Sequence, residues 1–248
     1  MECKLAEIRV MMLLCFILFA ALAAACLLAS CVQNQPYTPE PAASAIGQGA
    51  DQTSDSYVEA SGVTDPFIQK TGWWAKDSYV HYGIMIHNPN QDFDAYNVQV
   101  EITSFDENGA EMFSSIDIIH KIPAGEAIGF AGTSGNGWLP TSVTIRVIPA
   151  SAQYKPAACQ DDFDITEYSE QNKLYFRYEV TGYITNEMPD YVGTVDMSVL
   201  LLDQNQNIVA GYTGQAYKIK PGQNKSFLIT LHSAPDHASV QVYPQYAD

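Results

Sequence analysis

Apolar and polar residues alternate along much of the chain with a period of two. The segment 98–103 reads Val-Gln-Val-Glu-Ile-Thr, and 195–201 continues apolar at every second position. Similar alternation precedes each run, over 80–86 and 174–180. This period is typical of strands that bury one face. Hairpin turn residues such as those at 106–109 separate the segments. The pattern predicts an all-β protein beyond the apolar N-terminus.

The chain also repeats itself with an offset of 97 residues. Segment 98–143 overlays segment 195–240 without a gap, with ten identities in 46 positions, against about 3 expected from typical residue frequencies. The pairs at turn positions are Asp106 with Asp203, Asn108 with Asn205, Gly125 with Gly222 and, with one extra residue of offset, Asn88 with Asn186. A shared register of this length predicts two copies of one fold.

Strand spacing and turn signals predict the architecture of these copies. Six or seven short strands in about 85 residues are typical of an immunoglobulin-like sandwich. We therefore predict two tandem immunoglobulin-like β-sandwich domains. Repeat 1 covers residues 65–150, a short linker covers 151–161, and repeat 2 covers 162–248.

The first 30 residues have the layout of an export signal. Lys4 and Arg9 precede an unbroken apolar run over 10–29. A charged segment followed by an apolar stretch is typical of a signal peptide. A run of 20 residues is also long enough to span a bilayer as a helix. An uncleaved signal anchor is therefore the alternative.

The end of the apolar run favours cleavage. It reads Leu28, Ala29, Ser30 and Cys31. A branched apolar residue, two small residues and Cys resemble the lipobox of bacterial lipoproteins. The resemblance implies that residues 1–30 are a lipoprotein signal peptide and that Cys31 carries diacylglycerol and a further acyl chain such as palmitate. Two or more acyl chains give stable membrane anchoring.

The segment after the lipobox predicts a tether. Residues 31–64 are rich in small and polar side chains, hold no Lys or Arg, and show no strand or helix period. Such a segment buries too little apolar surface to order itself, so we predict a disordered linker with a reach of about 30 Å. Cys159, in the short linker, is the only later cysteine, and we expect an incidental thiol; the alternatives are a reactive thiol and pairing between chains. We place the protein at the cell membrane, lipid-anchored, on the extracytoplasmic face.

Both repeats carry the same order of motifs. A strand ends in an apolar residue and Asp, at 102–106 and again at 199–203, and is followed by an Asn or Gly turn, a Pro-Gly turn and a Phe strand. Together with the segment 82–90, this order resembles the FxLYD-type domain of bacterial surface lipoproteins, over residues 65–150 and 162–245. Both copies keep the Asp of the name motif and lack its first Phe. The resemblance implies a fold and a surface location, and no activity.

Charge narrows the choice of partners. The chain of 248 residues has a formal net charge of −16, which excludes a nucleic-acid partner because such binding needs a basic patch. The two repeats carry −6 each and the tether −4. Charge spread in this way is typical of solvated faces rather than of a concentrated cation site. We expect no cofactor, and the sequence holds no recognisable catalytic motif.

Three segments suggest binding sites, and each has a structural alternative. His81 and His87 share a strand face without a third zinc ligand at suitable spacing, so we expect a solvent-facing strand and no metal. The oxygen side chains of Asn88–Asp94 resemble a calcium loop, but Gly is missing at position six and Gln99 stands at position twelve. We expect a polar loop there. Gly132–Gly137 lacks the Lys of a phosphate loop and is expected to be a flexible loop.

Three tryptophans are the best candidates for contact with a ligand or partner: Trp73, Trp74 and Trp138. Exposed aromatic rings stack on sugars or anchor proteins. Since adjacent strand residues point to opposite faces, we expect one of Trp73 and Trp74 to be more exposed than the other; the alternative is that Trp73 or Trp74 fills the sandwich core. We hypothesise a non-enzymatic membrane-anchored lipoprotein that displays two β-sandwich modules for interaction with an extracytoplasmic protein or for envelope spacing. The alternative is a carbohydrate- or cell-wall-binding module that binds a glycan through exposed Trp residues.

Overall fold

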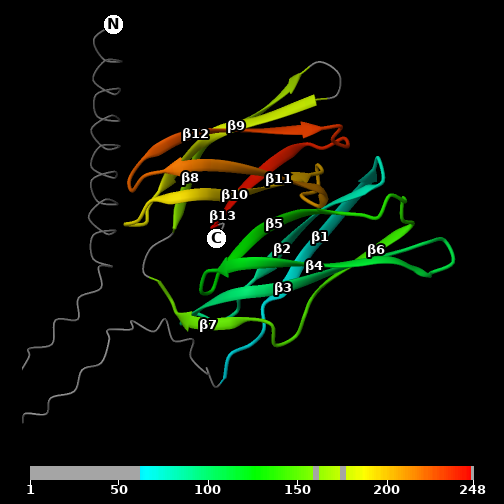
Figure 1. Cartoon of the computed structure of the whole chain (residues 1–248), viewed down its shortest axis with the longest axis horizontal. Coiled ribbons are helices and arrows are strands. Elements are labelled where there is room, and N and C mark those ends of the chain that lie inside the picture. The colour runs from blue at the N-terminus through cyan, green and yellow to red at the C-terminus, as the bar shows by residue number, and fades with distance from the viewer. Residues whose placement is uncertain (1–61, 159–161, 174–176, 247–248) are drawn as a thin grey trace, which may run out of the picture. The chain divides into compact units, whose positions relative to one another are not determined.

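The computed structural model describes residues 62–158, 162–173 and 177–246 (Figure 1). Every regular element among them is a β-strand, and the strands form antiparallel sheets, which confirms the predicted all-β sandwich class. The strands of the first half (residues 62–158) are β1 Phe67–Lys76, β2 Tyr79–His87, β3 Phe93–Phe105, β4 Glu111–Ile122, β5 Ala127–Ser134, β6 Ser142–Val147 and β7 Gln153–Pro156. Those of the second half (residues 162–246) are β8 Phe163–Lys173, β9 Arg177–Asn186, β10 Val192–Leu202, β11 Ile208–Ile219, β12 Asn224–His232 and β13 Ser239–Tyr246.

The strands pair in the same order in both halves. In the first half, β1-β2-β5 form one sheet and β4-β3-β6 form the other, with β7 beside β3. In the second half, β8-β9-β12 and β11-β10-β13 repeat these two sheets. Both ends of β4 and β11 differ by the 97 residues of the sequence repeat. The internal repeat is therefore a repeat of strand order and of register.

The β3–β4 and β10–β11 turns are closed by the same hydrogen bonds. Asp106 Oδ1 accepts two backbone N–H groups from the turn that follows it, both at 2.8 Å. Asp203 Oδ1 accepts the two equivalent groups, also at 2.8 Å. The left-handed residue is Gly109 in the first turn (φ 78°) and Gln206 in the second (φ 62°). An Asp side chain that binds its own turn fixes the hairpin locally.

A buried asparagine stands at the end of the second strand of each half, directly after β2 or as the last residue of β9. Asn88 and Asn186 are both fully buried. Asn88 Nδ2 donates to the carbonyl of Ile122, and Asn186 Nδ2 to that of Ile219, each at 3.2 Å. Each amide also donates at 2.8 Å to a carbonyl four or five residues further along the chain, that of Phe93 or of Asp190. Because buried carbonyls need partners, this side chain links the end of one strand to the end of another.

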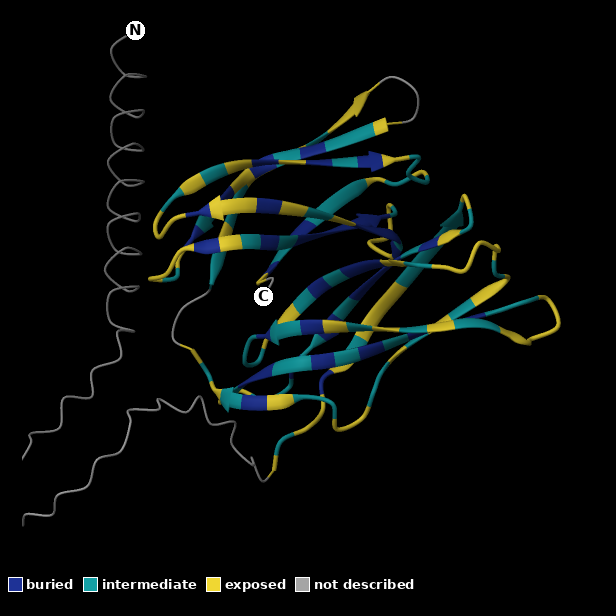
Figure 2. Ribbon diagram, in the orientation of Figure 1, coloured by how far each residue is buried: buried dark blue, intermediate teal, exposed yellow. Residues whose placement is uncertain are grey.

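Each half has its own apolar core, as the alternation predicts (Figure 2). The inward positions of β3 and β10 are completely buried. In β3, the residues that alternate with them are only partly buried. The buried inward residues are Val98, Val100 and Ile102 in β3 and Val195, Met197, Val199 and Leu201 in β10. The two-residue period thus identified the core face of both strands.

The two halves pack against each other along a seam. A third apolar cluster, made of Ala131, Leu200, Leu202 and Ile208, joins β5 to β10 and β11. In its vicinity the backbone N–H of Ala131 donates to Ser198 Oγ at 3.0 Å. Both halves belong to one compact unit, residues 54–248. The seam explains why β10 is buried on both faces along its second part.

Glycines permit a close approach of backbones at the seam. A Cβ on Gly72 of β1 would lie 1.7 Å from the carbonyl oxygen of Ile208. A Cβ on Gly211 of β11 would lie 2.2 Å from the carbonyl oxygen of Tyr82. Any larger residue would force the strands apart. The sheets can therefore meet this closely only because these positions lack side chains.

Several predicted features lie outside the described residues. They are the signal segment 1–30 with its Leu28, Ala29, Ser30 and Cys31 motif, nearly all of the tether 31–64, and Cys159. Residues 174–176 of one predicted strand also lie outside, and its remainder begins β9. Within the described ranges, no helix has the length and apolar character needed to cross a membrane. The anchoring segment remains a prediction from sequence.

Candidate functional site

Trp73 and Trp74 point to opposite faces of β1, as predicted, but neither is exposed. Trp73 packs against the core of the first half. Trp74 packs against the core of the second half, and its ring lies 6.1 Å from that of His81. Neither ring is free on the surface, because the second half covers the outer face of β1. Both rings contribute to packing at or near the seam.

The outer face of β2 is also covered, so the expectation of a solvent-facing strand was wrong. The His81 ring stacks on Tyr212 of the second half, with 4.7 Å between ring centroids, and burial lowers the pKa of His81. His87 lies at the other end of the strand, with Nδ1 3.0 Å from the carbonyl oxygen of Glu126. Among the described residues, no three His, Cys, Asp or Glu side chains are grouped to hold a metal.

Trp138 is the exposed member of the three tryptophans. It lies in the loop between β5 and β6, and its side chain is 71% exposed, beside Leu139 at 58%. The loop is held by Asn136, which donates to the carbonyl of Met112 at 3.0 Å and accepts the Trp138 N–H at 3.2 Å. Gly135 brings it against the β1–β2 turn, where Tyr79 is exposed. We call Tyr79, Trp138 and Leu139 the first-half tip.

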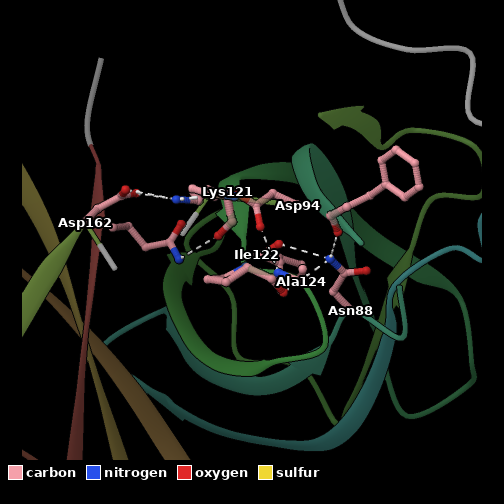
Figure 3. Close-up of polar contacts among 10 residues, drawn as sticks. Asn88, Asp94, Lys121, Ile122, Ala124 and Asp162 are labelled. Atoms are coloured by element: carbon pink, nitrogen blue, oxygen red, sulfur yellow. Dashed lines mark hydrogen bonds and ion pairs between the residues drawn. The ribbon is translucent and has the colours of Figure 1, made fainter. Parts of the chain in front are cut away.

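The segment Asn88–Asp94 is a polar loop that runs into the start of β3, and the Asp94 carboxylate is directed at the protein backbone (Figure 3). Asp94 is almost fully buried. Its Oδ1 accepts the N–H of Ala124 at 2.9 Å, and its Oδ2 accepts the N–H of Ala158 at 3.2 Å. The Asp94 carboxylate therefore ties this segment to the backbone after β4 and after β7.

Lys121 links this loop to the second half (Figure 3). Its Nζ donates to both carboxylate oxygens of Asp162 at 2.9 and 3.0 Å, and lies 3.7 Å from Asp94 Oδ2. Its side chain is 13% exposed. Burial opposes the charge, but the hydrogen bonds to Asp162 and the two nearby carboxylates outweigh it, so the pKa of Lys121 is raised. The ion pair fastens the start of β8 to the end of β4.

A second polar contact joins β2 to β4 beside β5. The buried Tyr82 hydroxyl donates to Asp117 Oδ2 in a short hydrogen bond. A Cβ on Gly132 would lie 2.3 Å from that hydroxyl, so the glycine makes room for it. Burial, and then the charge of Asp117, raise the pKa of Tyr82. Gly132–Ser134 thus belong to β5 and not to the flexible loop that we expected over 132–137, because pairing with β2 orders them.

Beside this contact the two halves leave a groove of about 590 Å³. We call it the inter-half groove. The polar side chains that line it come from both halves, and include Asp117, His120, Asp196, Gln215, Tyr217 and Gln245. Aligned neighbours on three strands supply the second-half wall, since Asp196 pairs in register with both Gln215 and Gln245. The groove thus brings together carboxylates from both halves.

Sequence reasoning did not find the groove. Asp117 and Asp196 are 79 positions apart and lie on strands of different halves. In each strand, the residues directly before and after the aspartate are apolar. The only local signal is a carboxylate within an otherwise apolar run, as in Ile116-Asp117-Ile118. That signal does not say which surface the side chain faces.

Comparisons with known proteins leave the family open. No protein-family model matches the chain, and no curated protein matches it. Among solved structures, one match is a chain titled pT26-6p, with 9% sequence identity and a TM-score of 0.21. The match covers 73% of this chain and 61% of that one, so it spans less than two thirds of the solved chain's length.

Proposed function

We propose that the chain is a non-enzymatic bacterial lipoprotein, anchored through Cys31 on the extracytoplasmic face of the membrane, that presents its β-sandwich halves as one rigid interaction module. The observation that supports this proposal is the seam. There the backbones of the two halves lie in close contact at Gly72 and Gly211, and a shared apolar cluster joins the halves. A rigid body on a long tether suits a protein that reaches for a partner while keeping its binding surface fixed.

The first-half tip is the surface that we assign to the partner. Trp138 and Leu139 expose adjacent large apolar side chains on a loop that is itself held by hydrogen bonds. Exposed aromatic anchors on an ordered backbone are typical of binding hot spots. The two repeats do not share this feature, because the position of Trp138 is occupied by Pro235 in the second half. The contact would therefore be made by one half.

Crosslinking to the extracytoplasmic proteins of the native cell tests this assignment. The double variant Trp138→Ala/Leu139→Ala should lose the crosslinked partner at least tenfold. The matched control is Tyr183→Ala/Leu228→Ala, which removes comparably exposed side chains from the second half and should leave crosslinking unchanged. Equal crosslinking by the tip variant and the unchanged protein would contradict the proposal.

Anchoring is tested separately by following the mass of the chain and its incorporation of radioactive palmitate. Cys31→Ala should leave the precursor unprocessed and unlabelled, and globomycin should have the same effect on the unchanged chain. Cys26→Ala is the control, since Ala24-Ala25-Cys26 offers a weaker cleavage site within the apolar run. Normal processing of the Cys31 variant would defeat the lipoprotein assignment.

A glycan partner is the second candidate, and the exposure of Trp138 is the observation that favours it. A flat aromatic side chain can stack on a sugar ring. On a glycan array, the unchanged chain should then bind and Trp138→Ala should not, whereas Leu139→Ala should bind nearly as well. An array without signal would remove this candidate and leave the protein-binding assignment in place.

A further inference from the structure

The dipeptide Asn-Gly occurs twice in the chain, as Asn108-Gly109 and as Asn136-Gly137. Asparagine is one of the thermally labile residues of proteins. A following glycine increases this lability, because a peptide without a side chain can approach the asparagine amide closely. Both pairs are exposed, the first in the turn between β3 and β4 and the second in the loop between β5 and β6. Both are therefore accessible to water.

The reaction open to such a pair is deamidation. The peptide nitrogen of the glycine loses its proton and attacks Cγ of the asparagine. A C–N bond forms, the Cγ–Nδ2 bond breaks, and the amide group leaves as ammonia with a proton taken from water. Water then opens the cyclic imide at either carbonyl, which gives aspartate or isoaspartate without oxidation or reduction. Attack within the pair is fast when the reacting atoms are held together.

The side chain of Asn136 is held in a position that favours this attack. Its Oδ1 accepts the N–H of Trp138 at 3.2 Å, and its Nδ2 donates to the carbonyl of Met112 at 3.0 Å. Because the Trp138 donor lies two residues along the chain, the side chain is folded over the Gly137 peptide. The same N–H stabilises the negative charge that develops on Oδ1 during attack. Among the described residues, no group accepts the N–H of Gly137.

Asn108 has a less favourable environment. The N–H of Gly109 donates to the carbonyl of Asp106 at 3.1 Å, which keeps the proton on the nitrogen that would attack. The Asn108 side chain hydrogen-bonds the carboxylate of Asp106. This negative charge opposes the anionic nitrogen and the oxyanion that the reaction requires. Asn108 is therefore the slower site and supplies a comparison within the same chain.

Conversion of Asn136 removes the bond that fastens its loop to β4. In aspartate, an acceptor oxygen replaces Nδ2 opposite the Met112 carbonyl, so a donor is lost and two acceptors face each other. In isoaspartate, the main chain runs through Cβ and Cγ, so the oxygen that accepted the Trp138 N–H becomes a main-chain carbonyl. Either product detaches the loop that carries Trp138 and Leu139.

We propose that Asn136 deamidates spontaneously in the folded chain and that its conversion releases the first-half tip from β4. The reaction needs only the chain and water. The second half has no such site, because Ser233 and Ala234 stand at the equivalent positions. Neither the conversion nor the release depends on anchoring or on a partner. A loss of partner binding as the chain ages, by contrast, rests on the proposed function.

Peptide mass mapping of the full chain during incubation in mildly alkaline buffer tests the conversion, since the attacking nitrogen must lose its proton. The peptide that holds Asn136 should convert at least tenfold faster than the one that holds Asn108. Release is measured by limited chymotrypsin digestion after Trp138, because loosened loops are cleaved first. Cleavage there should become at least fivefold faster as Asn136 converts, while the sheets stay resistant.

Three variants make the test specific. Asn136→Asp carries one of the products from the start and should be cleaved fast without incubation. Asn136→Gln keeps an amide that closes the larger imide ring slowly, so its cleavage rate should not change during incubation. Asn108→Asp adds the same charge to the other turn and should be cleaved like the unchanged chain.

Three results would overturn the proposal: conversion of Asn108 ahead of Asn136, conversion of Asn136 without faster cleavage after Trp138, or equally fast cleavage of the two aspartate variants. The last would mean that the loop responds only to the added charge. Both measurements are made without a partner. A partner whose capture does not need the first-half tip would count against the proposed function alone.

Discussion

The two halves agree in their turns and differ in their surfaces. Asp106 and Asp203 close equivalent hairpins with equal hydrogen-bond lengths. Gly125 and Gly222 both have positive φ, at 70° and 64°. These positions are the ones that the sequence repeat preserves. They are the same in both halves because a turn is determined by the few residues within it.

Equivalent surface positions have diverged. Lys121 pairs with Asp162 across the halves, whereas its repeat equivalent Lys218 is exposed with a left-handed backbone. The outer face of β2 is covered by the second half, but β9, its equivalent, exposes Tyr183. The second half therefore covers a strand of the first half, whereas the equivalent strand of the second half is not covered in the same way. The comparison teaches that the repeat specifies the strand order and turns of each half, while the surroundings of equivalent residues, such as Lys121 and Lys218, differ according to how the halves meet.

The largest loss of stability is expected from adding one methyl group at the seam between the two halves. Gly72→Ala places a Cβ 1.7 Å from a backbone oxygen of the second half, so we expect a loss of about 3 kcal/mol or more in the free energy of unfolding. Gly193→Ala, on a strand of the second half with no atom within 4 Å of the new Cβ, should change it by less than about 0.5 kcal/mol. Urea denaturation measures both, and equal values would refute the close seam.

The two buried asparagines test whether the halves have equivalent interiors. Asn88→Ala and Asn186→Ala each remove a buried amide that satisfies carbonyl groups, so each should lower the free energy of unfolding by about 2–3 kcal/mol. Asn224→Ala, at an exposed strand position, is the control and should cost little. If one buried asparagine proved dispensable, the two positions would not be structural equivalents.

The two lysines should respond differently. Lys121→Met leaves the carboxylate of Asp162 and the buried one of Asp94 without their cation, and we expect a loss of about 1–2 kcal/mol. Lys218→Met should be neutral within about 0.5 kcal/mol.

The pH dependence follows from the raised pKa of Lys121. Its folded-state pKa exceeds the ordinary value of 10.5, so its stabilisation is fully present below that value and is lost as pH rises through the folded-state pKa. The difference between the unchanged chain and Lys121→Met should therefore stay constant from about pH 6 to 9. Urea unfolding at several pH values checks this, and a difference that vanished at pH 8 would contradict it.

The smallest expected effect concerns the hairpin aspartates. Backbone N–H groups, chiefly those of Ala110 and Asn207, hold the pKa of Asp106 and of Asp203 below the ordinary 3.8. Their stabilisation is thus present above that value and is lost as pH falls through the lower folded-state pKa. Carbon-13 NMR titration of the two carboxyl groups should give two values below 3.8. A normal value for either would mean that its turn opens in solution.

The fold was largely accessible from sequence, and the site was not. Period-two alternation identified the inward residues of β3 and β10, and the 97-residue offset identified the equivalence of β4 and β11. The same alternation misassigned the outer face of β2, since His81 and His87 were expected on a solvent-facing strand. Burial on the second face depends on a sheet more than 100 residues away, which no local period reports.

The sequence by itself determined the strands, their turns, the repeat and the predicted export segment, because each of these depends on residues close together in the chain. Only the tertiary structure decided that the glycines of β1 and β11 are contact points, that Trp74 belongs to the core of the other half, and that Asp117 and Asp196 share a groove. These features depend on the packing of one sheet on another. Such packing is set by the summed shape of many side chains, and no short segment of the sequence records it.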